Sequence, residues 1–121
     1  MVGYRKPESA VQGQVMLYLR SKFRGKPAFY WKASDKYIGG IPDIVGVYRG
    51  QPWAIELKVP GGRVSSLQQA TLIQMREAGY SVTIAYGRPE VISFIEALIE
   101  EVDKRCKTNA LNQTLAKRSS T

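Results

Sequence analysis

The chain has 121 residues, of which 44% are hydrophobic and 23% are charged, and this composition predicts one globular domain. It contains no histidine and one cysteine, Cys106, which excludes an internal disulfide, a histidine-based catalytic triad and almost every structural zinc site. A bound metal ion would therefore need oxygen ligands, which favours Mg²⁺, Mn²⁺ or Ca²⁺.

The net charge of +8 suits a polyanionic partner such as nucleic acid. A basic protein with no nucleic-acid role and a protein that binds an acidic membrane surface remain open alternatives from the charge alone. No run approaches 18 apolar residues, so the sequence predicts no membrane span. Residues 1–8 lack an apolar stretch, which predicts no secretory signal and a cytoplasmic location.

Helical and strand patterns alternate along the chain. Pro7 suits the first position of a helix whose apolar residues recur at helical spacing until Gly25 ends it. Ser65 and Gln68 form a capping-box pattern at the start of a second helix, which stops at Gly79. The predicted elements, in chain order, are a helix at 7–24, strands at 29–33, 44–48 and 53–59, a helix at 65–78, a strand at 80–86 and a helix that begins at 89.

This order of elements predicts a three-layer mixed α/β domain, in which helices cover a small central sheet. We place the domain at residues 1–103 because the composition changes after Asp103. Residues 104–121 carry basic side chains without an acidic residue, and we expect them to form a flexible basic tail.

Charged residues interrupt two of the apolar strands. Asp43 precedes the run that begins at Ile44, and Glu56 and Lys58 lie two residues apart in the next strand. Because side chains alternate along a strand, Glu56 and Lys58 share one face. Burial of charges in an apolar strand is costly, so a functional reason is expected. The alternative is a solvated Glu–Lys ion pair on an edge strand, with Asp43 as a turn residue after Pro42.

The turn between these two strands predicts how they pair. If Arg49-Gly50 is a two-residue turn, or residues 48–51 a four-residue loop, paired residue numbers sum to 99 and Asp43 lies opposite Glu56. Their Cβ atoms would then be about 5 Å apart. Two carboxylates at that separation repel each other unless a cation or a proton lies between them. A loop of odd length would shift this register by one residue.

A divalent cation fits the space between two such carboxylates. Held by Asp43 and Glu56, it would neutralise a phosphate group and lower the pKa of a bound water. Lys58 could orient that water or stabilise the charge that develops on the phosphate. None of these roles needs the histidine that the chain lacks.

Three short motifs together resemble one nuclease family. Gly40-Ile41-Pro42-Asp43, Glu56-Leu57-Lys58 and Ser65-Ser66-Leu67-Gln68 are similar to the motifs of the virus-type replication-repair nuclease (VRR-NUC) family. That family belongs to the PD-(D/E)xK nuclease superfamily, and the similarity covers about residues 8–87. The resemblance implies the restriction-endonuclease-like fold, whose core has the same order of elements.

The resemblance also implies roles for individual residues. Asp43 and Glu56 would be metal ligands, the backbone carbonyl of Leu57 a further ligand, and Lys58 the catalytic lysine, with Mg²⁺ or Mn²⁺ as the cofactor. Gln68 matches a catalytic glutamine of the family, although the capping box alone would explain it. Glu8 matches an acidic metal ligand on the first helix, although a favourable interaction with the helix dipole is the alternative.

Compact members of the family resemble archaeal and phage Holliday-junction resolvases and act as homodimers, which implies a bacterial or phage-infected cell. The resemblance therefore implies a metal-dependent, structure-selective DNA endonuclease that nicks four-way junctions. A nuclease for flaps or other branched DNA, and a catalytically silent DNA-binding protein on the same fold, are the alternatives. A restriction-type enzyme that reads a base sequence is disfavoured because the short chain has no obvious inserted recognition segment.

Basic residues near the motifs are candidate phosphate contacts, and selectivity would come from DNA shape rather than base edges. Taken singly, a lysine or arginine of this kind is more often a solvated surface residue. The candidates are Lys32, Lys36, Arg63, Arg88 and the basic tail. The aromatic residues of the first strand are expected in the core or in a dimer interface rather than under DNA bases; they are Phe29, Tyr30 and Trp31.

Overall fold

The computed structural model describes residues 8–35 and 37–119 of the chain. The elements follow the predicted order, with boundaries within a few residues of the predicted ones except at the C-terminus. They are α1 (Glu8–Lys22), β1 (Ala28–Lys32), β2 (Ile44–Tyr48), β3 (Gln51–Leu57), α2 (Ser66–Glu77), β4 (Ser81–Ala85) and α3 (Arg88–Ser119).

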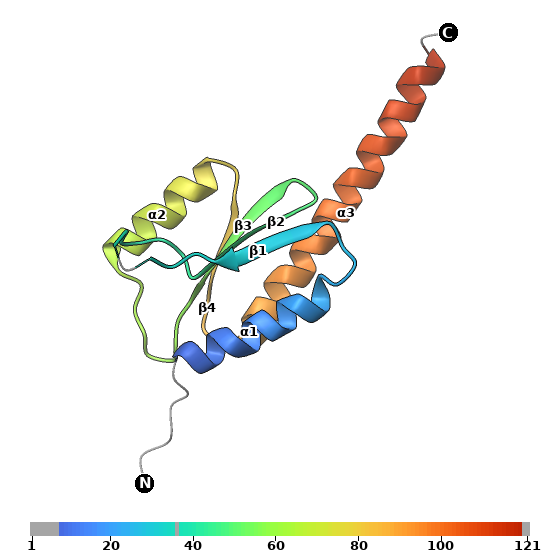
Figure 1. The fold of residues 1–121 in the computed structure, drawn as a ribbon. Coiled ribbons are helices and arrows are strands. Elements are labelled where there is room, and N and C mark those ends of the chain that lie inside the picture. The colour runs from blue at the N-terminus through green and yellow to red at the C-terminus, as the bar shows by residue number, and fades with distance from the viewer. Residues whose placement is uncertain (1–7, 36, 120–121) are drawn as a thin grey trace.

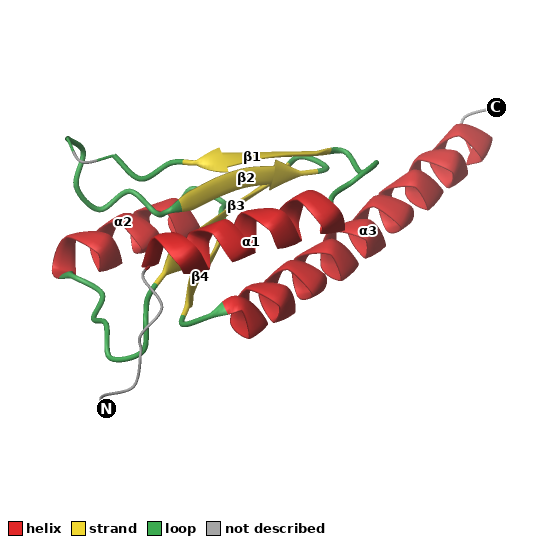
Figure 2. Ribbon diagram, turned by 60° about the horizontal axis from the view of Figure 1, so that its bottom comes forward, coloured by secondary structure: helices red, strands yellow, loops and turns green. Residues whose placement is uncertain are grey.

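The four strands form one mixed sheet in the order β1-β2-β3-β4. The first three strands are antiparallel neighbours, and β4 pairs with β3 in parallel after the crossover through α2. Figures 1 and 2 show α1 and α3 on one side of the sheet and α2 on the other. The three-layer α/β fold predicted from the sequence is therefore confirmed.

The hairpin between β2 and β3 has the predicted register. Ile44 pairs with Ile55 and Tyr48 pairs with Gln51, so paired residue numbers sum to 99. The turn consists of two residues, Arg49 and Gly50, which have φ angles of 45° and 82°. Positive φ at both central positions is the geometry that matches the twist of the flanking strands in a two-residue hairpin. A shift by one residue is thus excluded, although Arg49 adopts a conformation that arginine rarely takes.

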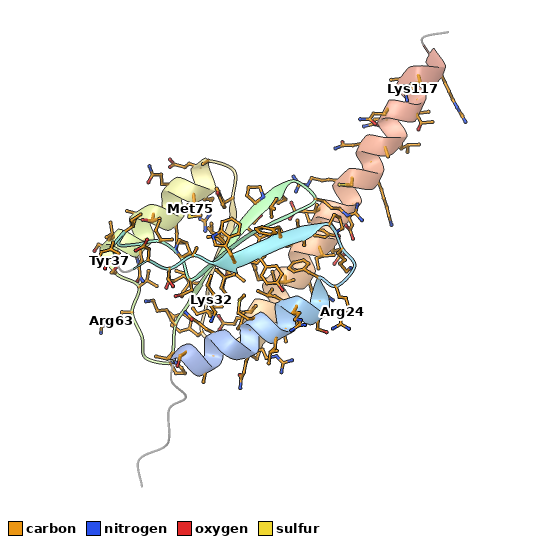
Figure 3. All side chains as sticks on the ribbon, viewed as in Figure 1. Arg24, Lys32, Tyr37, Arg63, Met75 and Lys117 are labelled. Carbon is orange, nitrogen blue, oxygen red and sulfur yellow. The ribbon has the colours of Figure 1, made fainter. Side chains whose placement is uncertain are left out.

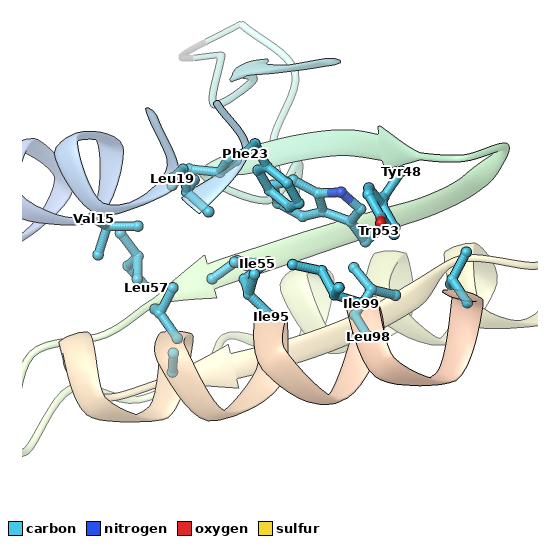
Figure 4. Close-up of a cluster of buried hydrophobic side chains, with 14 residues drawn as sticks. Val15, Leu19, Phe23, Tyr48, Trp53, Ile55, Leu57, Ile95, Leu98 and Ile99 are labelled. Atoms are coloured by element: carbon cyan, nitrogen blue, oxygen red, sulfur yellow. The ribbon is translucent and has the colours of Figure 1, made fainter. Parts of the chain in front are cut away.

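The main core lies between the sheet and the pair α1 and α3 (Figure 4). Trp53 is fully buried there, and its ring stacks on that of Phe23. Gly46 lies opposite Trp53 in the hairpin, and a Cβ atom at that position would overlap the indole ring. The large ring on β3 therefore requires a glycine on β2.

The last helix differs from the sequence prediction. α3 continues to Ser119, so residues 104–119 are helical, whereas the sequence predicted a flexible tail from residue 104. The segment contains neither glycine nor proline and is rich in helix-forming residues, so it extends a helix that the core has already nucleated. The domain boundary at residue 103 stays a prediction. None of the helices in the described part of the chain is long and apolar enough to cross a membrane.

Candidate active site

Asp43 is buried at the entrance to β2, where only 6% of its surface is exposed. Its Oδ2 atom accepts a hydrogen bond of 2.7 Å from the backbone N–H of Leu57, and Oδ1 accepts one of 3.1 Å from Gln12. Its backbone carbonyl accepts a hydrogen bond from Ala33. Two segments of the chain therefore hold the carboxylate and a third holds the backbone of Asp43, and each carboxylate oxygen keeps a lone pair for another ligand.

Glu56 is more deeply buried than Asp43, with 2% of its surface exposed. Its neighbours Ile55 and Leu57 pack into the main core, so strand alternation turns Glu56 to the opposite face of the sheet. The Lys58 Nζ atom lies 3.8 Å from Glu56 Oε1, and the Lys58 side chain is only 16% exposed. The predicted placement of Glu56 and Lys58 on one face is thus observed.

Gln68 has two roles in the structure. Its backbone N–H donates to Ser65 Oγ while its side-chain oxygen accepts from the Ser65 N–H, which completes the predicted capping box of α2. Its side-chain nitrogen is then directed at Glu56 Oε1, at 3.3 Å. The cap therefore positions the amide group that contacts the buried carboxylate.

These side chains line one open pocket of about 560 Å³. It lies at the end of the hairpin opposite the Arg49-Gly50 turn and is bounded by β2, β3, the start of α2 and the loop after β1. Its lining residues are Ser34, Asp35, Ile38, Gly40, Ile41, Asp43, Glu56, Lys58 and Gln68. The pocket therefore contains all four residues that the sequence predicted to be catalytic.

The chemistry of the pocket fits a divalent cation with oxygen ligands. The hairpin register carries Asp43 to the position opposite Glu56, so two buried carboxylates face one cavity. Within residues 8–35 and 37–119, no three His, Cys, Asp or Glu side chains cluster closely enough to enclose a metal ion by themselves. Water and phosphate oxygens would have to complete the coordination, which is how Mg²⁺ commonly binds in phosphoryl-transfer sites.

Comparison with known proteins identifies the family. The model of the VRR-NUC domain matches residues 16–89, which is more than half of the chain. The chain belongs to the VRR-NUC family. A VRR-NUC domain of known structure has the same fold, with a TM-score of 0.56 and 24% identity, and the alignment covers 69% of this chain and 92% of that one. No curated protein sequence matches the chain.

A VRR-NUC domain is a nuclease domain of the PD-(D/E)xK type, which implies that the chain binds DNA. Nucleases of this type typically use divalent metal ions. The matched region contains Asp43, Glu56, Lys58 and Gln68. It begins within α1 and ends at Pro89, so it leaves out residues 90–119 of α3.

Gln12, which donates a hydrogen bond to Asp43, was not among the site residues predicted from the sequence. A signal for it was available, because Gln12 lies three residues before the buried Val15 and therefore on the inward side of α1. The contact between Gln12 and the Asp43 carboxylate becomes visible only once α1 is placed against the sheet.

The other predicted residues lie outside the pocket lining or outside the described residues. Lys32, at the end of β1, and Arg63, on the loop before α2, are exposed (Figure 3), as is Arg88 at the start of α3. Lys36 and the side chain of Glu8 fall outside the described residues. Their roles in DNA or metal binding stay predictions.

The two roles of Gln68 can be separated by a pair of substitutions. Gln68→Glu keeps an oxygen that can accept from the Ser65 N–H, but it loses the donor to Glu56 and adds a third carboxylate. Ser65→Ala removes the cap and keeps the amide. We expect Gln68→Glu to lower DNA cleavage at least tenfold, and Ser65→Ala to cost about 1 kcal/mol of stability with little change in cleavage. Equal losses of cleavage in both variants, measured beside thermal unfolding, would contradict a role for Gln68 beyond the cap.

Proposed function

We propose that this protein is a metal-dependent endonuclease that hydrolyses phosphodiester bonds in branched DNA. One observation carries the proposal: two buried carboxylates and a largely buried lysine line a single open pocket in a VRR-NUC domain. Asp43, Glu56 and the backbone carbonyl of Leu57 would hold Mg²⁺ or Mn²⁺. When bound, the ion supplies positive charge beside the phosphate and lowers the pKa of water.

The side chains around the ion have separate tasks in this mechanism. The hydrogen bonds from Leu57 and Gln12 hold the Asp43 carboxylate in one orientation. Lys58 and Gln68 both direct a nitrogen at Glu56 Oε1, which limits rotation of that carboxylate. The Lys58 ammonium can orient the attacking water or stabilise the charge that develops on the phosphate.

A catalytically silent DNA-binding protein on the same fold is the second candidate. Such a protein would have no need to bury two carboxylates next to a DNA surface, because they repel phosphate and are costly to desolvate. The presence of Asp43, Glu56 and Lys58 in one pocket therefore favours the enzyme.

We further propose that the DNA substrate is a four-way junction and that the protein acts as a homodimer. Symmetric cleavage of a junction requires two active sites, which two copies of the chain would provide. Phosphate contacts from Lys32, Arg63 and Arg88, together with Lys36, would recognise the shape of the DNA rather than its base sequence.

Cleavage of labelled DNA substrates tests this function. A four-way junction, a flap and a linear duplex of matched sequence are incubated with Mg²⁺, with Mn²⁺ and with EDTA. We expect nicks at symmetric positions in the junction, a slower reaction on the flap and no reaction in EDTA. Equal cleavage of junction and linear duplex would remove the junction proposal, and an absence of cleavage in every substrate would remove the nuclease proposal.

The dimer proposal makes a prediction about the edge strand β1. Phe29 and Trp31 are 67% and 46% exposed, and their rings lie 5.7 Å apart on the same side of the strand, so they form an apolar patch suited to a second copy. We expect Phe29→Ser/Trp31→Ser to convert a dimer into a 13.5 kDa monomer in sizing chromatography. Leu17→Ser, at another exposed apolar residue on α1, is the control and should leave the dimer intact. A wild-type monomer at working concentration would contradict the prediction.

A further inference from the structure

The last 15 described side chains of α3 form a helical arm, residues 104–118, which projects away from the domain (Figures 1 and 3). Every side chain from residue 107 to 118 is exposed. The arm contains five basic residues and no acidic one, and five uncharged hydrogen-bonding residues lie among them. The basic residues are Lys104, Arg105, Lys107, Lys117 and Arg118, and the uncharged ones are Thr108, Asn109, Asn112, Gln113 and Thr114.

The base of the arm is attached to the β2–β3 turn. Asp103 accepts a hydrogen bond of 2.6 Å from the Tyr48 hydroxyl and forms an ion pair of 3.1 Å with Arg49. Burial, and then the hydrogen bond to Asp103, raise the pKa of Tyr48 above its ordinary value, so the hydroxyl remains a donor at neutral pH. Arg105 donates a hydrogen bond of 2.9 Å to Gln51, on the other strand of the hairpin. These contacts fix the direction in which α3 leaves the domain.

The basic residues of the arm are not distributed evenly around the helix. Val102 is buried in the core, and Lys104 follows two residues later, about 200° around the helix, so it faces away from the domain. From Lys104 onward, successive spacings of 3, 4, 4 and 3 residues define one outward stripe, which consists of Lys104, Lys107, Leu111, Leu115 and Arg118. Three of the five basic residues therefore share one outward face, two at the base of the arm and one at its tip, with two leucines between them.

We infer that this arm binds the backbone of duplex DNA at a distance from the cleaved bond. The inference rests on the proposed function, because it assigns the arm to the same DNA. Lys, Arg, Thr, Asn and Gln side chains are the usual donors to phosphate oxygens, and the arm consists mainly of these residues. Two exposed leucines could instead pair two arms, but each arm carries five positive charges, so a second copy would be repelled.

The structure also specifies where on the DNA the arm would bind. Its base is held at the hairpin turn, whereas Asp43 and Glu56 lie at the opposite end of the same two strands. Five paired residues at about 3.4 Å each separate the two ends by about 17 Å, which equals about five base pairs of duplex. The arm itself is about 22 Å long, so its contacts would begin at least about five base pairs from the cut.

Neutralisation of the arm tests the inference. The variant Lys104→Gln/Lys107→Gln/Lys117→Gln/Arg118→Gln keeps Arg105 at its anchor, and glutamine preserves helix propensity. A control, Arg20→Gln/Arg24→Gln/Lys26→Gln/Arg76→Gln, removes four exposed charges from the domain, so both variants lower the net charge from +8 to +4. The dissociation constant is measured by fluorescence anisotropy against salt concentration, with a duplex of about 30 base pairs and Ca²⁺ to prevent cleavage.

For the arm variant we expect the dissociation constant to rise at least about tenfold at about 0.15 M salt, and the salt slope to fall by roughly one for each lost phosphate contact. The control should change both quantities by less than half as much. Equal effects in the two variants, or no effect in either, would overturn the inference. Binding to vesicles of anionic lipid is measured for the same two variants. The inference would also be overturned if the arm variant lost binding to the vesicles but kept wild-type binding to DNA.

A cleavage assay distinguishes failure of this inference from failure of the proposed function. On a substrate whose duplex ends about four base pairs from the cut on both sides, the arm variant and the wild type should react at equal rates, because the arm has no DNA to reach. On the longer substrate the variant should be slower below saturation. A wild type that cleaves neither substrate would contradict the nuclease proposal, whereas the binding measurements would still decide the role of the arm.

Discussion

Substitution of either buried carboxylate by its amide is expected to reduce DNA cleavage by at least about a thousandfold, with DNA binding retained in Ca²⁺. Asp43→Asn and Glu56→Gln keep the size and shape of each side chain and remove one negative charge from the metal site. The Gln12 amide can rotate to accept a hydrogen bond from an asparagine at position 43, so the local structure should persist. The rate is measured on labelled junction DNA with saturating Mg²⁺.

Lys58→Ala should reduce the rate of DNA cleavage by a similar factor. The reason differs, because this substitution removes the ammonium group beside the phosphate and leaves both carboxylates in place. The matched control is Glu77→Gln, which removes an exposed carboxylate at the end of α2. It should leave the rate within about twofold of the wild type. Unchanged cleavage in Lys58→Ala would exclude the proposed mechanism, and equal losses in Glu77→Gln would point to a general effect of charge.

The second large effect is expected on stability. Two buried carboxylates that face one pocket repel each other in the metal-free protein, and a bound divalent cation removes that repulsion. A ligand at about one hundred times its dissociation constant stabilises the folded state by about 2.7 kcal/mol. For a domain of this size, Mn²⁺ or Mg²⁺ should therefore raise the melting temperature by roughly 10 °C.

In Asp43→Asn and Glu56→Gln, by contrast, a divalent cation should have little effect on the melting temperature. Each removes one of the two charges, so the metal-free variants should melt at or above the wild-type temperature, and their response to Mn²⁺ should be largely lost. Differential scanning calorimetry with EDTA and with Mn²⁺ measures both quantities without any DNA. An equal rise of melting temperature in the wild type and in both variants would place the cation at another site.

The sequence was sufficient for the features that depend on neighbours along the chain. Alternation and helical spacing predicted the order of the elements, and the capping box at Ser65 and Gln68 is local by nature. The two-residue turn at Arg49-Gly50 predicted the strand register, because loop length determines which residues pair. That register alone places Asp43 opposite Glu56.

The tertiary structure alone decided which residues distant in the sequence meet. Gln12 and Asp43 are 31 positions apart, and only the packing of α1 against the sheet brings them into contact. The exposed Phe29 and the core-packed Tyr30 are adjacent in the same aromatic run, and the pleat of an edge strand separates them.

The C-terminal segment shows the same division between local composition and tertiary structure. Its polar composition predicted a flexible tail from residue 104, yet the helix continues because the core has already formed the preceding turns of α3. Nucleation is the costly step in helix formation, and tertiary packing supplied it. The sequence therefore determined the fold order and the chemical groups of the site, whereas packing decided how those groups are held and where the basic arm projects.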